Sequence, residues 1–149
     1  MRTLILIDNN VDDLQFMKEA ISSVDPHIQS LSFICADEVV KALQHDLIVK
    51  PDTIFININM PAKSGFKCFL ELRNNETFND VPIFVYAPRI TSEIIESLKD
   101  SGATLTFEKP NTIRGWKEKM NELLNSISNS HTSHPMDVYN AAGVLVLNK

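Results

Sequence analysis

The chain has 149 residues, a length that suits one domain built around one hydrophobic core. Apolar residues make up 44% of it and charged residues 22%, a balance typical of a globular protein and not of a disordered one. The net charge of −5 gives no support for nucleic-acid binding through bulk electrostatics, because neutralising phosphates takes clustered lysine and arginine. The cysteines, Cys35 and Cys68, form no CxxC pair and have no histidine at metal-ligand spacing, so we expect reduced thiols in a cytoplasmic protein.

Short apolar runs alternate along the chain with longer segments whose apolar residues recur at helical spacing, and Asn9 or Asn10 is available to cap the first helix. The first run, residues 4–7, is too short for a secretion signal or a membrane span, so no membrane association is expected. Alternation of this kind predicts an α/β fold, a doubly wound, mainly parallel five-stranded sheet with helices on both faces. In chain order the expected elements are strand 4–7, helix 11–24, strand 28–34, helix 36–47, strand 53–56, helix 66–72, strand 81–86, helix 90–98, strand 103–107 and helix 113–127.

The C-terminal part of the chain differs in character from the rest. We expect a domain over residues 1–128, a polar linker over 129–137 and an apolar tail over 138–149. The tail is predicted to fold back as an added strand or to pair with the sheet edge of another subunit, which would give a homodimer. A mobile terminus is the alternative.

Polar residues follow the predicted strands at the points where the strands end. Because the carboxyl ends of parallel strands lie at one edge of a sheet, we expect these residues to converge on one crevice. They are Asp8, Asn9 and Asn10 with Asp12 and Asp13 beyond them, then Asn57, Ile58 and Asn59, then Tyr86, Ala87 and Pro88, and last Glu108, Lys109 and Pro110.

Four short motifs at these positions occur in a fixed order: Leu6-Ile7-Asp8-Asn9, Ile56-Asn57-Ile58-Asn59-Met60-Pro61 with Gly65 closing the loop, Gly102-Ala103, and Lys109-Pro110. With them, residues 1–128 resemble the receiver domain of two-component response regulators. The resemblance implies a flavodoxin-like (βα)5 fold with strand order 2-1-3-4-5. It also implies a stand-alone module of bacterial phosphorelay signalling.

The resemblance further assigns a role to each position of the crevice. In the family, an acidic pair and a backbone carbonyl hold magnesium, an aspartate accepts phosphate, and a hydroxyl and a lysine contact the phosphoryl group. An aromatic residue on the fifth strand often reports switching. Carried over, the acidic pair falls on Asp8 and Asn9, the phosphoacceptor on Asn57, the carbonyl on Asn59, the hydroxyl on Tyr86, the aromatic switch on Thr106 and the lysine on Lys109.

The departures from the family pattern concern the reactive groups. Forming an acyl phosphate takes an anionic oxygen nucleophile, which the carboxamide of Asn57 lacks. Magnesium prefers one or two carboxylates with water, and only Asp8 remains of the usual three. We therefore expect no cofactor, and Mg²⁺ bound weakly or not at all by Asp8 and the Asn59 carbonyl.

Three further expectations concern side-chain placement. Lys109 is predicted to pair with Asp8 and to hydrogen-bond the amide oxygen of Asn57. Tyr86 is predicted to lie at the rim with its hydroxyl in water, or else to lock the adjacent loop in one state. Asp12 and Asp13 are predicted to favour the N-terminus of the first helix, not to bind metal.

These residues favour a degenerate receiver, a pseudo-receiver that is no enzyme and acts by binding a protein such as a sensor kinase. The binding surface would span about residues 91–128, with Arg89, Glu93, Glu96, Lys99, Lys117 and Glu118 as exposed candidates. A phosphorylation switch is the alternative, through Asp8 or through deamidation of Asn57. A flavodoxin-like cofactor binder is more remote, because the acidic segment 8–13 has no glycine and repels phosphate.

Overall fold

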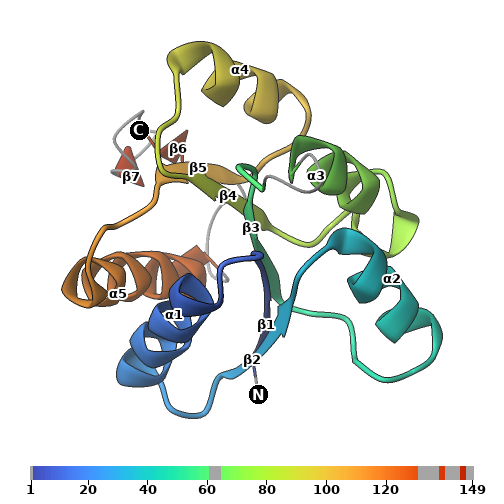
Figure 1. The fold of residues 1–149 in the computed structure, drawn as a ribbon, viewed down its shortest axis with the longest axis horizontal. Helices are drawn as coiled ribbons and strands as arrows, with labels where there is room; N and C mark the ends of the chain where they lie inside the picture. Colours follow the sequence, from blue (N-terminus) through green and yellow to red (C-terminus); the bar gives the residue numbers. More distant parts are fainter. Residues whose placement is uncertain (1, 61–64, 131–137, 140–144, 147–149) are drawn as a thin grey trace.

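The computed structural model describes residues 2–60, 65–130, 138–139 and 145–146 (Figure 1). Within them strands and helices alternate as predicted, with one short 3₁₀ helix, η1, that the sequence did not indicate. In chain order the elements are β1 (Thr3–Ile7), α1 (Val11–Val24), β2 (Gln29–Phe33), α2 (Ala36–Gln44), β3 (Thr53–Asn57), α3 (Gly65–Arg73), η1 (Glu76–Phe78), β4 (Ile83–Ala87), α4 (Ser92–Asp100), β5 (Leu105–Glu108), α5 (Ile113–Ser130), β6 (Val138–Tyr139) and β7 (Leu145–Val146).

The five-stranded sheet has the order β2-β1-β3-β4-β5, and each neighbouring pair of strands is parallel. The predicted strand order is therefore confirmed. All residues of β1, β3 and β4 are buried, as expected for central strands of a sheet that helices cover on both faces. The register places Asn57 beside Tyr86 and Ala87 beside Glu108, so the carboxyl ends of the strands lie at one edge.

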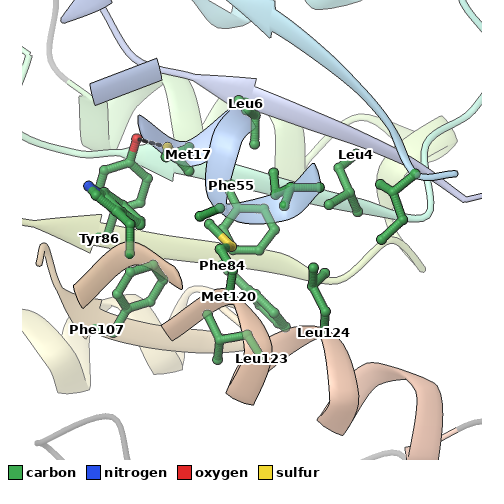
Figure 2. Close-up of a cluster of buried hydrophobic side chains, with 14 of the residues drawn as sticks. Leu4, Leu6, Met17, Phe55, Phe84, Tyr86, Phe107, Met120, Leu123 and Leu124 are labelled. Carbon is green, nitrogen blue, oxygen red and sulfur yellow. Dashed lines mark hydrogen bonds between the residues drawn. The ribbon is translucent and has the colours of Figure 1, made fainter. Parts of the chain in front are cut away.

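Two hydrophobic clusters fill the two sides of the sheet. On the side of α1 and α5 (Figure 1), the cluster includes five aromatic residues, and Phe55, Phe84 and Phe107 pack there among leucines and methionines (Figure 2). On the side of α2, α3 and α4, the cluster is mostly aliphatic. The alternation of side chains along each strand divides the residues between these two cores.

Local capping sets the ends of several helices. The Asn10 side chain accepts a hydrogen bond from Asp13 N and so caps α1, which settles the choice between Asn9 and Asn10. Thr91 caps α4 in the same way, so this helix begins at Ser92 and not at residue 90 as predicted. The predicted helix 36–47 ends earlier, at Gln44, because Asp46 takes a left-handed conformation with φ 56°.

The C-terminal segment was only partly foreseen. Helix α5 continues to Ser130, two residues beyond the predicted start of the linker at residue 129. The rest of the predicted linker, residues 131–137, and residues 140–144 and 147–149 of the tail lie outside the described part. Of the tail, β6 and β7 pair with each other antiparallel as a separate two-stranded sheet, and β6 lies beside the edge strand β5 (Figure 1). The described tail residues thus form a ribbon of their own, and pairing with another subunit stays a prediction.

Candidate functional site

Asp8 is the centre of the polar group at the carboxyl edge of the sheet. It directly follows β1 and has 0% of its surface exposed. Its Oδ1 accepts a hydrogen bond of 2.9 Å from Asn10 N, and its Oδ2 accepts one of 2.7 Å from the Tyr86 hydroxyl. Both carboxylate oxygens are therefore satisfied, which is the condition under which a carboxylate is tolerated in a protein interior.

Asn57, at the end of β3, faces Asp8 directly. Its Nδ2 lies 3.3 Å from both carboxylate oxygens and donates to them, while its Oδ1 accepts a 2.8 Å hydrogen bond from Asn59 N. The side chain is 4% exposed. The amide therefore uses its donor and its acceptor within the protein, and it presents a neutral group at the expected phosphoacceptor position.

Tyr86 lies within the protein and not at its rim, so the expectation of a hydroxyl in water is wrong. The residue is 0% exposed, and its hydroxyl donates to Asp8 while it lies 3.3 Å from Met17 Sδ (Figure 2). Its ring stacks on Phe107 at 5.4 Å and meets Trp116 edge-on at 5.5 Å. Burial, and then the charge of Asp8, raises the pKa of the phenol well above its usual value. The hydroxyl therefore stays a donor to Asp8.

Lys109 does not make the predicted pair with Asp8. Its Nζ lies 2.6 Å from Asp13 Oδ2, in an ion pair whose side chains are 19% and 9% exposed. Asp8 instead accepts hydrogen bonds from three uncharged donors, which are the Tyr86 hydroxyl, the Asn57 amide and the backbone N–H of Asn10. The predicted hydrogen bond from Lys109 to the Asn57 amide oxygen is also wrong, because Lys109 donates to Asp13 and the Asn57 oxygen accepts from Asn59 N.

Asp13 is the member of the polar network whose partner the sequence did not predict, since the sequence assigns it only to the helix N-terminus. A signal was available: Asp13, Met17 and Ile21 are four residues apart and lie on the same buried stripe of α1. A carboxylate on a buried stripe requires a cationic or hydrogen-bonding partner. Lys109, which follows β5 at the same edge, is that partner.

The other predicted positions lie around this network. Asn9 and Asn59 are exposed, and Asn59 contributes its backbone N–H to Asn57. Thr106 alternates on β5 with two members of the α1–α5 core, Leu105 and Phe107, so its side chain lies on the opposite face of the sheet. On β4, Ala87 shares that face with Thr106, whereas Tyr86 does not.

The donor set does not fit a magnesium ion. Asn57 directs an N–H donor at Asp8, where a cation would require oxygen acceptors, and both oxygens of Asp8 accept hydrogen bonds. Among the described residues, no group of three or more histidine, cysteine or acidic side chains is arranged to hold a metal.

The strand order and the helices on both faces are those of the receiver domains of response regulators. The crystal structure of the phosphorylated cyanobacterial phytochrome response regulator RcpA superimposes with a TM-score of 0.76 at 17% identity. That alignment covers 89% of this chain and 96% of the other. The receiver fold predicted from the sequence is confirmed.

Sequence comparisons find response regulators among the similar proteins, although no protein-family model matches the chain. The chain is 23% identical over 106 residues to stress response regulator protein 1 of Candida tropicalis, which covers 71% of this chain and 39% of that protein. It is 29% identical over 140 residues to protein-glutamate methylesterase/protein-glutamine glutaminase 1 of Methanosarcina acetivorans, covering 91% and 37%. The chain therefore spans well under half the length of these relatives.

Proposed function

We propose that this chain is an atypical receiver of two-component signalling that binds a protein partner and accepts no phosphate. The observation that carries the proposal is the neutral, fully hydrogen-bonded amide of Asn57 at the phosphoacceptor position. Phosphoryl transfer to a receiver requires a carboxylate oxygen to attack phosphorus, and an amide oxygen that accepts from Asn59 N is a poor nucleophile. The chain would act as a binding module and not as an enzyme.

Asp8 is a poor substitute acceptor. It is completely buried, and each of its oxygens already accepts a hydrogen bond shorter than 3 Å, from Asn10 N at 2.9 Å and from Tyr86 at 2.7 Å. A phosphodonor would have to displace the Tyr86 ring from the aromatic cluster to reach Oδ2. The geometry therefore disfavours the alternative of a phosphorylation switch through Asp8.

Conversion of Asn57 to aspartate by deamidation is opposed by the backbone. The reaction begins with attack of the following peptide nitrogen, Ile58 N, on the side-chain carbonyl carbon. Ile58 N donates instead to Tyr86 O at 3.0 Å, and the Asn57 amide is held at both ends. The alternative of a flavodoxin-like cofactor binder is disfavoured by segment 8–13, because the buried carboxylate of Asp8 would repel a flavin phosphate there.

The surface that we assign to a protein partner is formed by α4, β5 and α5, about residues 91–128. The six charged candidates on and next to it are all exposed, and acidic and basic residues are interspersed there, which suits a protein and not a nucleic acid. Ile94 adds an apolar point with 39% exposure. Glu118 is engaged with Arg114 at 3.2 Å on the same helix, so it is the candidate least available to a partner.

Two further features bear on where and how the module works. No helix in the described ranges is long and apolar enough to cross a membrane. Cys35 and Cys68 are free thiols, which is the usual state in a reducing compartment, and we place the protein in the cytoplasm. We also propose that it needs no magnesium, since the donor set does not fit the ion.

The decisive test is incubation of the intact chain with acetyl phosphate and MgCl₂, followed by intact-mass measurement. We expect no phosphoryl adduct, under conditions in which a receiver with an aspartate acceptor is modified. A stoichiometric gain of one phosphoryl group would overturn the proposal. Peptide mapping of any adduct would then identify the acceptor, with Asp8 and Asp13 as the buried carboxylates of the polar network.

A further inference from the structure

We infer that Asp13 is a positioning residue that holds Lys109 on α1, so that a carboxylate restored at position 57 would not by itself recreate a phosphate-accepting site. The inference rests on the proposed function, because it concerns what the site lacks besides the acceptor. It is carried by the 2.6 Å ion pair between Lys109 Nζ and Asp13 Oδ2. The lysine that would contact a phosphoryl group is thereby committed to a different carboxylate.

The ion pair is hard to exchange for a new contact. Both side chains are mostly removed from solvent, at 19% exposure for Lys109 and 9% for Asp13. If Lys109 moved to a phosphoryl group on residue 57, the Asp13 carboxylate would remain buried without its cation, which is costly in a medium of low polarity. Asp13 therefore competes with the phosphoryl group for the lysine ammonium.

A carboxylate at position 57 would also meet a repulsive neighbour. Asn57 Nδ2 lies 3.3 Å from both oxygens of Asp8, so Asn57→Asp replaces a donor with a second negative charge at that distance. Two carboxylates so close disfavour each other's ionised forms unless a cation is present. Lys109 could supply that charge only after it is released from Asp13.

The reaction to be measured is transfer from acetyl phosphate. An oxygen of the new carboxylate at position 57 forms a bond to phosphorus, the bond between phosphorus and the acetyl oxygen breaks, and acetate leaves with the electron pair. The product is an acyl phosphate, and negative charge on the transferred group is stabilised by a nearby ammonium. Freeing Lys109 should therefore accelerate this step.

The experiment compares Asn9→Asp/Asn57→Asp with the same chain carrying Asp13→Asn in addition. Asp13→Asn keeps the shape of the side chain and the backbone N–H that Asn10 caps. The matched control is Asp12→Asn in the same background, because Asp12 lies in the same first turn of α1 but is exposed. Phosphorylation by acetyl phosphate with MgCl₂ is followed by intact mass over time.

We expect the Asp13→Asn triple variant to be modified on the order of 100-fold faster than the double variant, which is the scale reported for one charge-stabilising donor. The Asp12→Asn control should match the double variant. A purely structural role of Asp13 would lower the rate or leave it unchanged. Equal and measurable rates in the double variant and the Asp13→Asn variant would overturn the inference, whereas modification of the native chain would overturn only the proposed function.

A stability cycle decides the question where no variant reacts. Urea denaturation of the native chain, Asp13→Asn, Asn57→Asp and their combination is followed by the fluorescence of Trp116, the single tryptophan of the chain. In the native background Asp13→Asn should lower the urea midpoint, because it leaves Lys109 without its anion. In the Asn57→Asp background the loss should be clearly smaller, since Lys109 then has a second carboxylate to approach. Additive losses would show that Lys109 does not choose between the two carboxylates, and the inference would fail.

Discussion

The two faces of the sheet hold the carboxyl edge in different ways. On the α1–α5 face, Tyr86 belongs to the hydrophobic core and donates a hydrogen bond from its hydroxyl to Asp8 at the edge. Asp13 of α1 forms the ion pair with Lys109. On the opposite face, covered by α2, α3 and α4, the side chains of Ala87 and Thr106 lie toward this end of the sheet, and the core is mostly aliphatic. The ion pair and the buried charge are thus both tied to one layer of helices.

This asymmetry connects the polar site to the folding core. A phosphorylation switch would need Asp8 and Lys109 to move freely. Asp8 is hydrogen-bonded to Tyr86, which packs against Phe107 and Trp116, and Lys109 is ion-paired with Asp13. Moving Asp8 or Lys109 would therefore disturb the packing of α1 and α5. The site behaves as part of the core on this face, and its residues should show the energetics of core residues.

The largest expected effect comes from removing the aromatic side chain that bridges the core and the site. We expect Tyr86→Ala to destabilise the fold by about 3–5 kcal/mol, the usual range for a buried aromatic. Phe69→Ala, in the fully buried core of the opposite face, is the matched control and should cost a similar amount for its cavity. Tyr86→Ala should cost more than this control, because it also removes the short hydrogen bond that Tyr86 donates to the buried Asp8. A smaller cost for Tyr86→Ala in urea denaturation would contradict the comparison.

A smaller effect is expected from breaking the ion pair at the same edge. Asp13→Asn should reduce the free energy of unfolding by about 1–3 kcal/mol, the scale of a partly buried hydrogen bond between charged groups. Asp12→Asn removes the same charge one residue away from an exposed position and should change stability by less than about 0.5 kcal/mol. The difference between these two variants, measured by thermal and urea denaturation, isolates the contact with Lys109. Equal effects would mean that α1 does not hold the lysine.

Alkaline pH probes the phenol of the same network. Burial and the charge of Asp8 raise the pKa of Tyr86 well above its ordinary value, so the unfolded chain loses this proton at a lower pH than the folded chain. The folded state then binds more protons, and stability falls as pH rises above about 10, by up to about 1.4 kcal/mol per pH unit. In Tyr86→Phe this contribution disappears, and the decline should be shallower. Urea midpoints measured across the alkaline range test this, and parallel declines in the two chains would speak against a buried neutral phenol.

The sequence predicted the architecture of this protein better than its contacts. The alternation of strands and helices was predictable because it is a local signal, and capping narrowed the start of α1 to Asn9 or Asn10. The strand order came from the family resemblance and is confirmed. Gly65 was assigned to the end of the β3–α3 loop, and the structure explains the residue type, since a Cβ there would lie 2.3 Å from Ile58 Cα. The alternation, the caps and the glycine depend on short stretches of chain, whose geometry the residues themselves dictate.

The partners of Lys109 and the direction of Tyr86 were not predictable in the same way. The run 81–86 is apolar throughout, so it has no polar–apolar alternation to show which face of the sheet Tyr86 occupies. Topology brings Asp8, Asp13, Asn57 and Lys109 to one edge but does not decide which carboxylate the lysine meets. That choice depends on the turn of α1 above the edge, and therefore on tertiary packing.

The smallest expected effect concerns the C-terminal ribbon of β6 and β7, which lies beside the edge strand β5. If the tail folds back on its own chain, removing residues 131–149 should leave the oligomeric state, measured as mass in solution, unchanged. It should lower the melting temperature by about 2–4 °C, corresponding to roughly 1 kcal/mol. Removing only residues 147–149 keeps both strands and serves as the control. A change from dimer to monomer on truncation would show that the tail pairs with a second subunit. If truncation changes neither mass nor stability, the tail neither stabilises its own chain nor pairs with a second subunit. The β5 edge is then stabilised by the rest of the domain alone.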